Sequence, residues 1–438
     1  MSRSTEPAAI EESDPRRAYQ QALRCADASR LRELSTILHV EPGTRPVQLV
    51  ESILRQLDEP GVASGLVAGL DAGSRLALGL FAMTETYAWP EAGLSLALRL
   101  LGIEPDDVIP LLLEQGLLVE APGKTSGPPN SGELMADSPV LIAHPAAPAA
   151  ARTLVPTGTG LPVIAHVHQV READGLETLL RLAALWQRVA EAPLRQTQQG
   201  VFYKRDQERL DDDPALAGPI ADHIEPLPDM IALWVALARG VGLLHMDAAR
   251  DALIAAPADF WAENAVHLPR MIALSWLGLR GWHEVGGWQG VGGKGLLAAP
   301  FLRPALLLWL AACAEPGWVA LDDLEAHLRR LGGEAFGVVL GAVEERAAAG
   351  RRGRSAASKT NGPTLPGLVA AILLGPAYQF GLVRVAEEDP GRRRVAQLTP
   401  LGRYVLALGP PPPPREVADR FLFVQPNFEV IAYRQGLT

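Results

Sequence analysis

Three times in this 438-residue chain, a helix-like stretch runs into a glycine followed by leucine and then continues as a short extended segment. The three glycines are Gly116, Gly242 and Gly381. A glycine just past a helix adopts the left-handed conformation that ends the helix without a steric penalty. Alternating apolar residues after that point favour a strand. The pattern therefore predicts three copies of a helix that leads directly into a β-strand.

The third copy is the most complete. Residues 381–408 are predicted to form a strand, a tight basic turn, a second strand and a closing helix. Helices followed by a two-stranded hairpin with a basic tip have the arrangement of a winged helix. The predicted fold class is mainly α with small β-hairpins, arranged as tandem winged-helix-like units and followed by the C-terminal stub of an α+β domain. Such a tandem array indicates macromolecule binding rather than small-molecule chemistry.

Composition limits the class of partner. With 48% apolar and 21% charged residues, the chain is expected to fold into two to four well-buried domains. Its formal net charge of −10 argues against a general electrostatic attraction to nucleic acid, so such binding must depend on local patches. Only four lysines are present, so nearly all positive charge is arginine.

Several features predict a cytoplasmic protein that does not enter a membrane. Cys25 and Cys313 lie far apart in sequence, as expected of two reduced thiols. The polar N-terminus has no apolar core of a secretory signal. The most apolar stretch, 296–314, is interrupted by Arg303 and Pro304, which leaves runs too short to cross a bilayer.

Turn signals and composition predict a series of separate segments. A Pro-Gly turn divides two amphipathic helices near the N-terminus, which form either a SAP-like nucleic-acid module or a plain helical hairpin. Seven of the nine tryptophans lie between Trp234 and Trp318, at helical spacings that favour core anchors over a base-stacking platform. The predicted segments are a disordered leader (1–17), a SAP-like helical pair (18–60), a first winged-helix-like unit (61–150), a second, Trp-rich unit (151–300), a third unit (301–409), a polyproline linker (410–415) and the start of a further domain (416–438).

The last segment carries the most recognisable motif, FLFVQPNFEVIAY. After tandem winged helices, this motif resembles bacterial helicase-associated proteins that carry an XPB-type helicase N-terminal domain. The residues that match that family's strand are Phe421, Val424, Gln425, Pro426, Phe428 and Val430. The resemblance implies DNA association, in repair or as an accessory to a helicase motor. Since a strand here has no partner strand after it, either the chain is a fragment of a longer protein, which we expect, or this end docks back onto another domain.

The chain lacks the motifs of a motor. The nearest match to a phosphate-binding loop is 286–295, where Lys294 is followed by Gly295 and Trp288 replaces the required glycine. No acidic helicase motif is present, so we expect no enzyme activity and no cofactor. His166 and His168 share strand spacing, but two ligands without neighbouring cysteines or carboxylates do not make a metal site, and none is expected.

Two basic clusters remain as candidate nucleic-acid contacts. One is the tip of the third unit's hairpin, and the other is a polar loop of the same unit. Arginine forks suit phosphate oxygens, and such contacts position a protein without reading sequence. The alternative for the tip is a solvated turn partly neutralised by Glu387, Glu388 and Asp389. The candidate residues are Arg392, Arg393 and Arg394 at the tip, and Arg351, Arg352, Arg354 and Lys359 in the loop.

Two functions from different classes follow. The first is a non-catalytic, helicase-associated module that binds the DNA backbone through the third unit. The second is a protein-interaction scaffold of winged helices that never contacts DNA. A scaffold predicts that the arginines at the tip face glutamates and that an apolar patch is left exposed. DNA binding predicts a positive face and an affinity that falls steeply with salt.

Overall fold

The fold is mainly α with small antiparallel sheets, as the sequence predicts. No helix in the described part of the chain is long and apolar enough to cross a lipid bilayer. A computed structural model of the protein describes residues 14–40, 45–84, 87–121, 139–151, 160–197, 202–247, 249–288, 299–313, 317–331, 365–389, 393–413, 422–424 and 430–432.

The three predicted helix exits are confirmed. Gly116, Gly242 and Gly381 have φ angles of 71°, 81° and 69°, in the left-handed region that favours glycine. At each exit, the amide of the leucine after the glycine donates to a carbonyl five residues back, at 2.8–3.0 Å. This is the hydrogen bond of a Schellman motif, which satisfies a carbonyl at the end of the helix.

The same order of elements occurs three times. In each copy a helix, a strand and further helices lead to a two-stranded hairpin, and the copy's first strand pairs with the second strand of that hairpin. The first unit contains α5 (Ala72–Met83), β1 (Ala88–Pro90), α6 (Glu91–Leu100), α7 (Pro105–Glu114), β2 (Leu118–Ala121) and β3 (Val140–Ala143). The second contains α9 (Leu176–Glu191), β5 (Leu194–Arg195), α10 (Lys204–Asp211), α11 (Pro214–Ala217), α12 (Met230–Gly240), β6 (Leu244–Asp247) and β7 (Ala252–Ala255). The third contains α15 (Ala299–Ala312), β10 (Val319–Ala320), helical residues 321–331, α17 (Leu365–Leu374), α18 (Pro376–Gln379), β11 (Val383–Glu387), β12 (Arg394–Leu398) and the closing helix α19 (Pro400–Val405).

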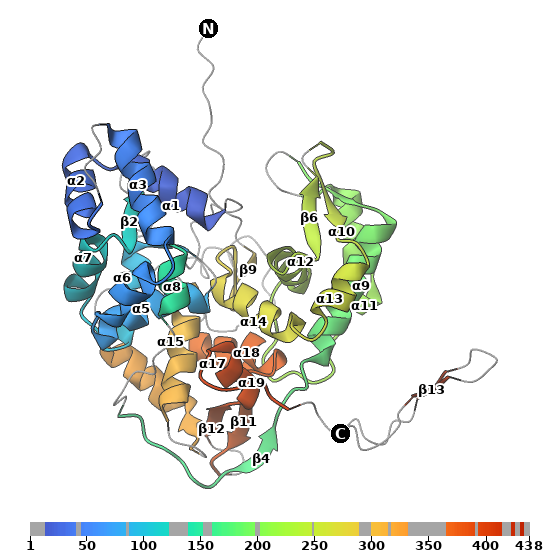
Figure 1. The fold of residues 1–438 in the computed structure, drawn as a ribbon. Helices are drawn as coiled ribbons and strands as arrows, with labels where there is room; N and C mark the ends of the chain where they lie inside the picture. Colours follow the sequence, from blue (N-terminus) through green and yellow to red (C-terminus); the bar gives the residue numbers. More distant parts are fainter. Residues whose placement is uncertain are drawn as a thin grey trace, which may run out of the picture.

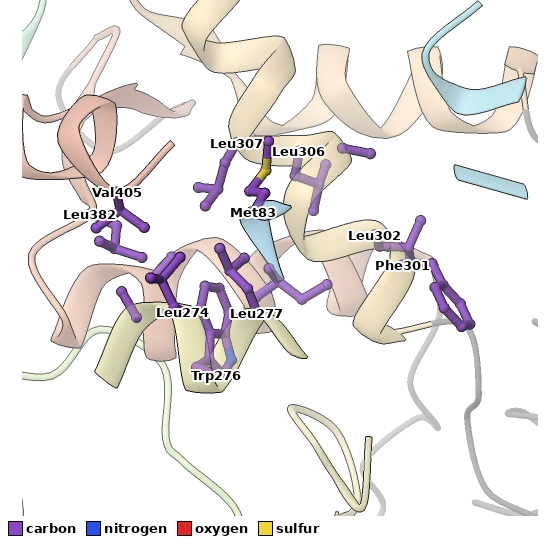
Figure 2. Close-up of a cluster of buried hydrophobic side chains, with 14 of the residues drawn as sticks. Met83, Leu274, Trp276, Leu277, Phe301, Leu302, Leu306, Leu307, Leu382 and Val405 are labelled. Atoms are coloured by element: carbon purple, nitrogen blue, oxygen red, sulfur yellow. The ribbon is translucent and has the colours of Figure 1, made fainter. Parts of the chain in front are cut away.

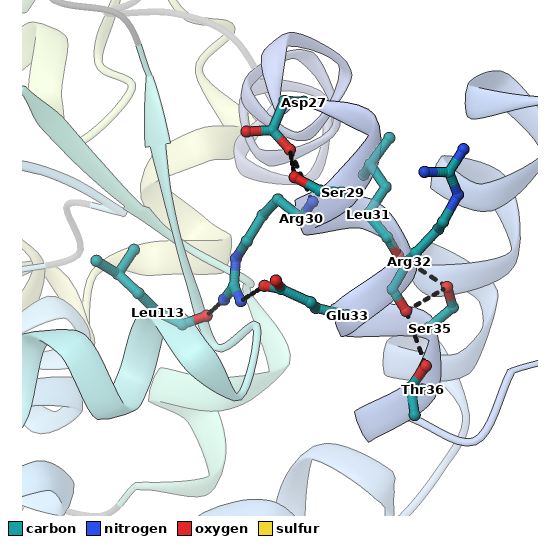
Figure 3. A network of polar contacts seen from close by, with 9 residues as sticks. All are labelled: Asp27, Ser29, Arg30, Leu31, Arg32, Glu33, Ser35, Thr36 and Leu113. Carbon is teal, nitrogen blue, oxygen red and sulfur yellow. Dashed lines mark hydrogen bonds and ion pairs between the residues drawn. The ribbon is translucent and has the colours of Figure 1, made fainter.

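The N-terminal helices pack on the first unit rather than standing apart from it (Figure 1). The Tyr19 hydroxyl donates to the carbonyl of Gly116, and the Arg30 guanidinium donates to that of Leu113 (Figure 3). The two predicted helices are present, but a further helix precedes them and begins at Pro15, inside the predicted leader 1–17. The helices are α1 (Pro15–Cys25), α2 (Ala28–Ile37), α3 (Pro46–Asp58), α4 (Val62–Ala68) and, after β3, α8 (Ala146–Ala150).

A segment that precedes the second unit's helices crosses the sheet of the third unit. Ile164 forms a β-bridge with Trp318 beside one edge strand, and β4 (His168–Arg171) pairs with β11 at the other edge (Figure 1). Between these points, Ile164 and Val167 pack on a small cluster that contains Trp318 and Val395. We call residues 160–171 the strap. Although the strap falls within the predicted second unit, its strand belongs to the third unit's sheet.

One hydrophobic core joins all three units. Figure 2 shows Met83 of α5, Leu277 of α14 (Leu268–Gly278) and Leu306 of α15 in the same cluster of buried side chains. The Trp309 indole donates to the Leu100 carbonyl at 3.1 Å and so fixes α15 against the first unit. Most of the tryptophans are buried core residues, as predicted, but Trp288 is exposed. The elements between the second and third units are α13 (Asp259–Asn264), α14 (Leu268–Gly278), β8 (Trp282–His283) and β9 (Gly287–Trp288).

The C-terminal segment forms a hairpin rather than a lone strand. β13 (Leu422–Val424) pairs antiparallel with β14 (Val430–Ala432), with Phe423 opposite Ile431. The expectation of a strand without a partner is therefore wrong, because the two halves of the predicted motif pair with each other. The hairpin lies away from the rest of the molecule in Figure 1.

Candidate nucleic-acid interface

The tip of the third unit's hairpin places Arg393 among three carboxylates. The guanidinium lies 3.0 Å from Asp323, 3.1 Å from Glu388 and 3.6 Å from Asp322. Partial burial would lower the pKa of Arg393, but the three carboxylates outweigh this effect and raise its pKa above the ordinary value. The side chain is 38% exposed, so a phosphate that approached it would have to displace carboxylates already bound.

Arg394, the first residue of β12, is also paired. Its guanidinium lies 3.2 Å from Glu225, a residue of the second unit, and 51% of the side chain is exposed. The alternative of a turn neutralised by its own acidic residues therefore holds for Glu388. The remaining carboxylates come from the helix at 321–331 and from the second unit.

The other candidate residues lie outside the described part of the chain. This applies to one residue of the tip and to the whole polar loop, so the structure does not place them relative to Arg393 and Arg394. They are Arg392, Arg351, Arg352, Arg354 and Lys359.

The helices before the hairpins offer little basic surface, since among them α12 carries a single arginine, Arg239, in its last turn. The helices α7 and α17 contain no lysine or arginine, and α7 exposes Asp106 and Asp107 instead. In α12 and α17 most side chains belong to the hydrophobic core. These helices are therefore unsuited to entering a groove of DNA. Any contact with the phosphate backbone of DNA would come from the hairpins and from neighbouring arginines.

Sequence reasoning missed an arginine-lined groove on the second unit. The groove has a volume of about 630 Å³ and lies between α10 and the turn end of the β6–β7 hairpin. Its arginines are dispersed along the sequence and do not form a run. The one sequence signal that could have indicated this groove is the pair Arg205 and Arg209, which lie four residues apart and so on the same face of a predicted helix. The lining residues are Ala192, Pro193, Arg195, Arg205, Asp206, Arg209, Arg250 and Ala252.

Two further features of the described residues bear on chemistry. Among these residues, no three His, Cys, Asp or Glu side chains come together in a way that would hold a metal ion. His166 and His168 are both exposed, on the strap. The structure therefore offers no metal centre within the part of the chain that it describes.

Comparisons with protein-family models, with curated proteins and with solved structures gave no match to this chain. A functional proposal must therefore rest on the C-terminal motif, on the repeated order of elements and on the placement of charge.

Proposed function

We propose that this protein is a non-catalytic DNA-binding module of three winged-helix units that works with a helicase motor. The observation that carries the proposal is the threefold repeat of one element order and one sheet order, each ending in a hairpin. Winged helices commonly use such hairpins to contact the phosphate backbone. The resemblance of the C-terminal motif to helicase-associated proteins supplies the link to a motor.

The contacts would position DNA rather than read its sequence. Of the helices that precede the hairpins, α7 begins with two acidic residues and most of α12 is buried, which leaves few side chains to reach base edges. At the third unit, a DNA phosphate would replace some of the carboxylates that now pair with Arg393, and Arg394 would lie beside this contact. Because this exchange replaces existing ion pairs, the resulting affinity should be modest. It should also fall with salt, because phosphate contacts release counterions from the DNA.

A protein-interaction scaffold is the second candidate, and two observations favour it. The ion pairs of Arg393 and Arg394 are those expected if the tip never meets a phosphate. In addition, Leu176 and Leu180 lie one turn apart on α9 with 53% and 67% of their surface exposed. Exposed apolar side chains at helical spacing suit a partner protein.

The deciding experiment is a salt titration of binding to a fluorescent DNA duplex. The full chain is compared with the Arg392→Ala/Arg393→Ala/Arg394→Ala variant. Under the proposal, binding weakens steeply between about 50 and 200 mM salt, and the variant loses most of it. A matched control replaces three exposed arginines far from the tip, Arg24, Arg32 and Arg99, and should bind almost normally. Absence of binding at low salt would contradict the proposal and favour the scaffold.

A further inference from the structure

The lining of the arginine groove on the second unit is positively charged, whereas the protein as a whole is negatively charged. Four of its eight lining residues are arginines and one is an aspartate, which gives a local formal charge of +3 (four minus one) in a chain of −10. Arginine forks match phosphate geometry and are weakly hydrated, so a concave group of them favours a phosphate-bearing ligand. Such a reversal of sign is the electrostatic feature expected of a polyanion site.

Asp206 organises one side of the groove. Its carboxylate accepts from the backbone amide of Arg195 at 3.2 Å and from that residue's Nε at 3.3 Å, and it lies 3.9 Å from Arg209. The Arg209 Nη2 also donates to the Ala192 carbonyl at 2.8 Å. The two arginines are thus held in place before any ligand arrives, while the Arg209 Nε is buried and has no partner among the described residues.

The other two arginines are more accessible. Arg205 is exposed and has no ion-pair partner in the described part of the chain. Arg250 is 73% exposed, and among the described residues its ion-pair partner is Asp247, at 3.6 Å within its own hairpin turn. Compared with Arg393, which three carboxylates surround, these two guanidinium groups are much more available to an incoming anion.

An exposed aromatic ring lies next to the arginines. Tyr203 is 48% exposed, and the guanidinium carbon of Arg195 lies 5.3 Å from the centre of its ring. A cation held against a ring in this way leaves an aromatic surface on which a nucleic-acid base can stack. A phosphate-binding surface beside such a ring suits nucleic acid better than an isolated inorganic anion.

We propose that the arginine groove binds the phosphodiester backbone of nucleic acid, with Tyr203 contacting an adjacent base. The inference rests on the proposed function in taking the ligand to be nucleic acid, but it places the main contact on the second unit. The groove lies at the turn end of the β6–β7 hairpin, where Arg195 of β5 pairs with Ala252 of β7. The groove therefore lies at the same end of the second unit's sheet as Arg393 does in the third unit's sheet. In the third unit, carboxylates neutralise the arginine at that end.

The test uses the full chain and an Arg205→Gln/Arg250→Gln variant, because neither side chain is buried. Fluorescein-labelled single-stranded and duplex oligonucleotides are titrated at several salt concentrations. The variant should bind about tenfold more weakly at low salt, and the slope of log affinity against log salt should fall by about 1.4–1.8. Arg24→Gln/Arg99→Gln, which removes the same charge elsewhere, should change affinity less than about twofold. Tyr203→Ala should weaken single-strand binding more than Tyr203→Phe, which keeps the ring.

The outcomes separate this inference from the proposed function. One outcome is that the Arg205→Gln/Arg250→Gln variant binds DNA normally while the Arg392→Ala/Arg393→Ala/Arg394→Ala variant loses DNA binding. This outcome would overturn the inference and leave the proposed function standing. No oligonucleotide binding by the wild-type chain would overturn both. A labelled mononucleotide that binds as tightly as the oligonucleotides would overturn a backbone site. Arginine-dependent binding of polyglutamate without oligonucleotide binding would assign the groove to an acidic protein partner.

Discussion

At the scale of single residues, the left-handed glycines fix where strands can begin. Gly242 has a φ of 81°, and a Cβ built there would meet its nearest neighbours at 3.7 and 3.8 Å, which are ordinary contact distances. The penalty of a side chain at this position is therefore backbone strain alone.

We predict that Gly242→Ala lowers the free energy of unfolding by about 1–2 kcal/mol, the penalty of a left-handed conformation for an L-residue. Urea denaturation measures the change. Gly65→Ala is the control, since Gly65 lies inside α4 with nothing within 4 Å and an ordinary helical backbone. That variant should lose no stability. Equal losses in the two variants would contradict the explanation.

A buried histidine makes stability depend on pH. Burial, with a smaller contribution from Arg303, lowers the pKa of His283 to about 4, although Glu284 opposes the shift. The unfolded chain takes up this proton near pH 6.5 and the folded protein does not, so stability is complete above that pH and falls as pH drops toward 4.

We predict that this histidine removes about 2 kcal/mol of stability between about pH 7.5 and pH 5. The matched variant is His283→Asn, whose side-chain oxygen can still accept from the Gly286 amide, as the histidine Nδ1 does. Urea midpoints at the two pH values give the comparison, and the variant should lose less stability on acidification than the wild type. An identical loss would show that other groups are responsible.

At the scale of elements, the strap explains how the third unit's sheet is completed. An edge strand such as β11 leaves unpaired backbone groups, and β4 covers them. Ile164 and Val167 attach the preceding residues to the face of the same sheet. The strap is thus an integral part of a unit that begins more than a hundred residues further along the chain.

We predict that Ile164→Asn/Val167→Asn detaches the strap and exposes the edge of the sheet. Hydrogen exchange at the amides of β11 should become faster while exchange in β6 and β7 stays unchanged, because the second unit keeps its own sheet. The control is Val163→Asn, at a neighbouring side chain that is 50% exposed. Unchanged exchange in β11 would contradict an attachment by these two residues.

The sequence predicted most elements but not this one. Helices such as α3 and α9 show apolar periodicity over several turns, which reflects one buried face and can be read locally. The side chains of β4 are all exposed, so its sequence carries no alternating pattern. Its strand conformation comes from backbone pairing with β11, which no local pattern reveals.

At the scale of the whole molecule, a buried arginine connects the third unit to the elements that precede it. Arg303 of α15 and Glu284 are both fully buried, with 2.7 Å between Nε and Oε1. The guanidinium also donates to the carbonyls of Trp276, Leu279 and Trp282. Because the buried guanidinium of Arg303 donates to several groups of the loop after α14, it holds that loop against α15.

We predict that Arg303→Met lowers the free energy of unfolding by about 3–5 kcal/mol, because it leaves a buried carboxylate unpaired. Urea denaturation followed by tryptophan fluorescence measures this loss. Arg17→Met removes an exposed arginine that is paired with the exposed Asp14 at the start of the same helix, and it should cost less than about 1 kcal/mol. A loss for Arg303→Met no larger than that of the control would contradict the structural role.

The sequence by itself determined where helices end and hairpins begin, because a glycine with positive φ and the apolar periodicity beside it are properties of neighbouring residues. Only the tertiary structure decided which arginines meet distant carboxylates and which gather together. Arg394 meets Glu225 across 169 residues of sequence, whereas Arg205 and Arg250 come together in a groove. The physical reason is that charges interact through distance in space, which the order of residues along a chain does not give.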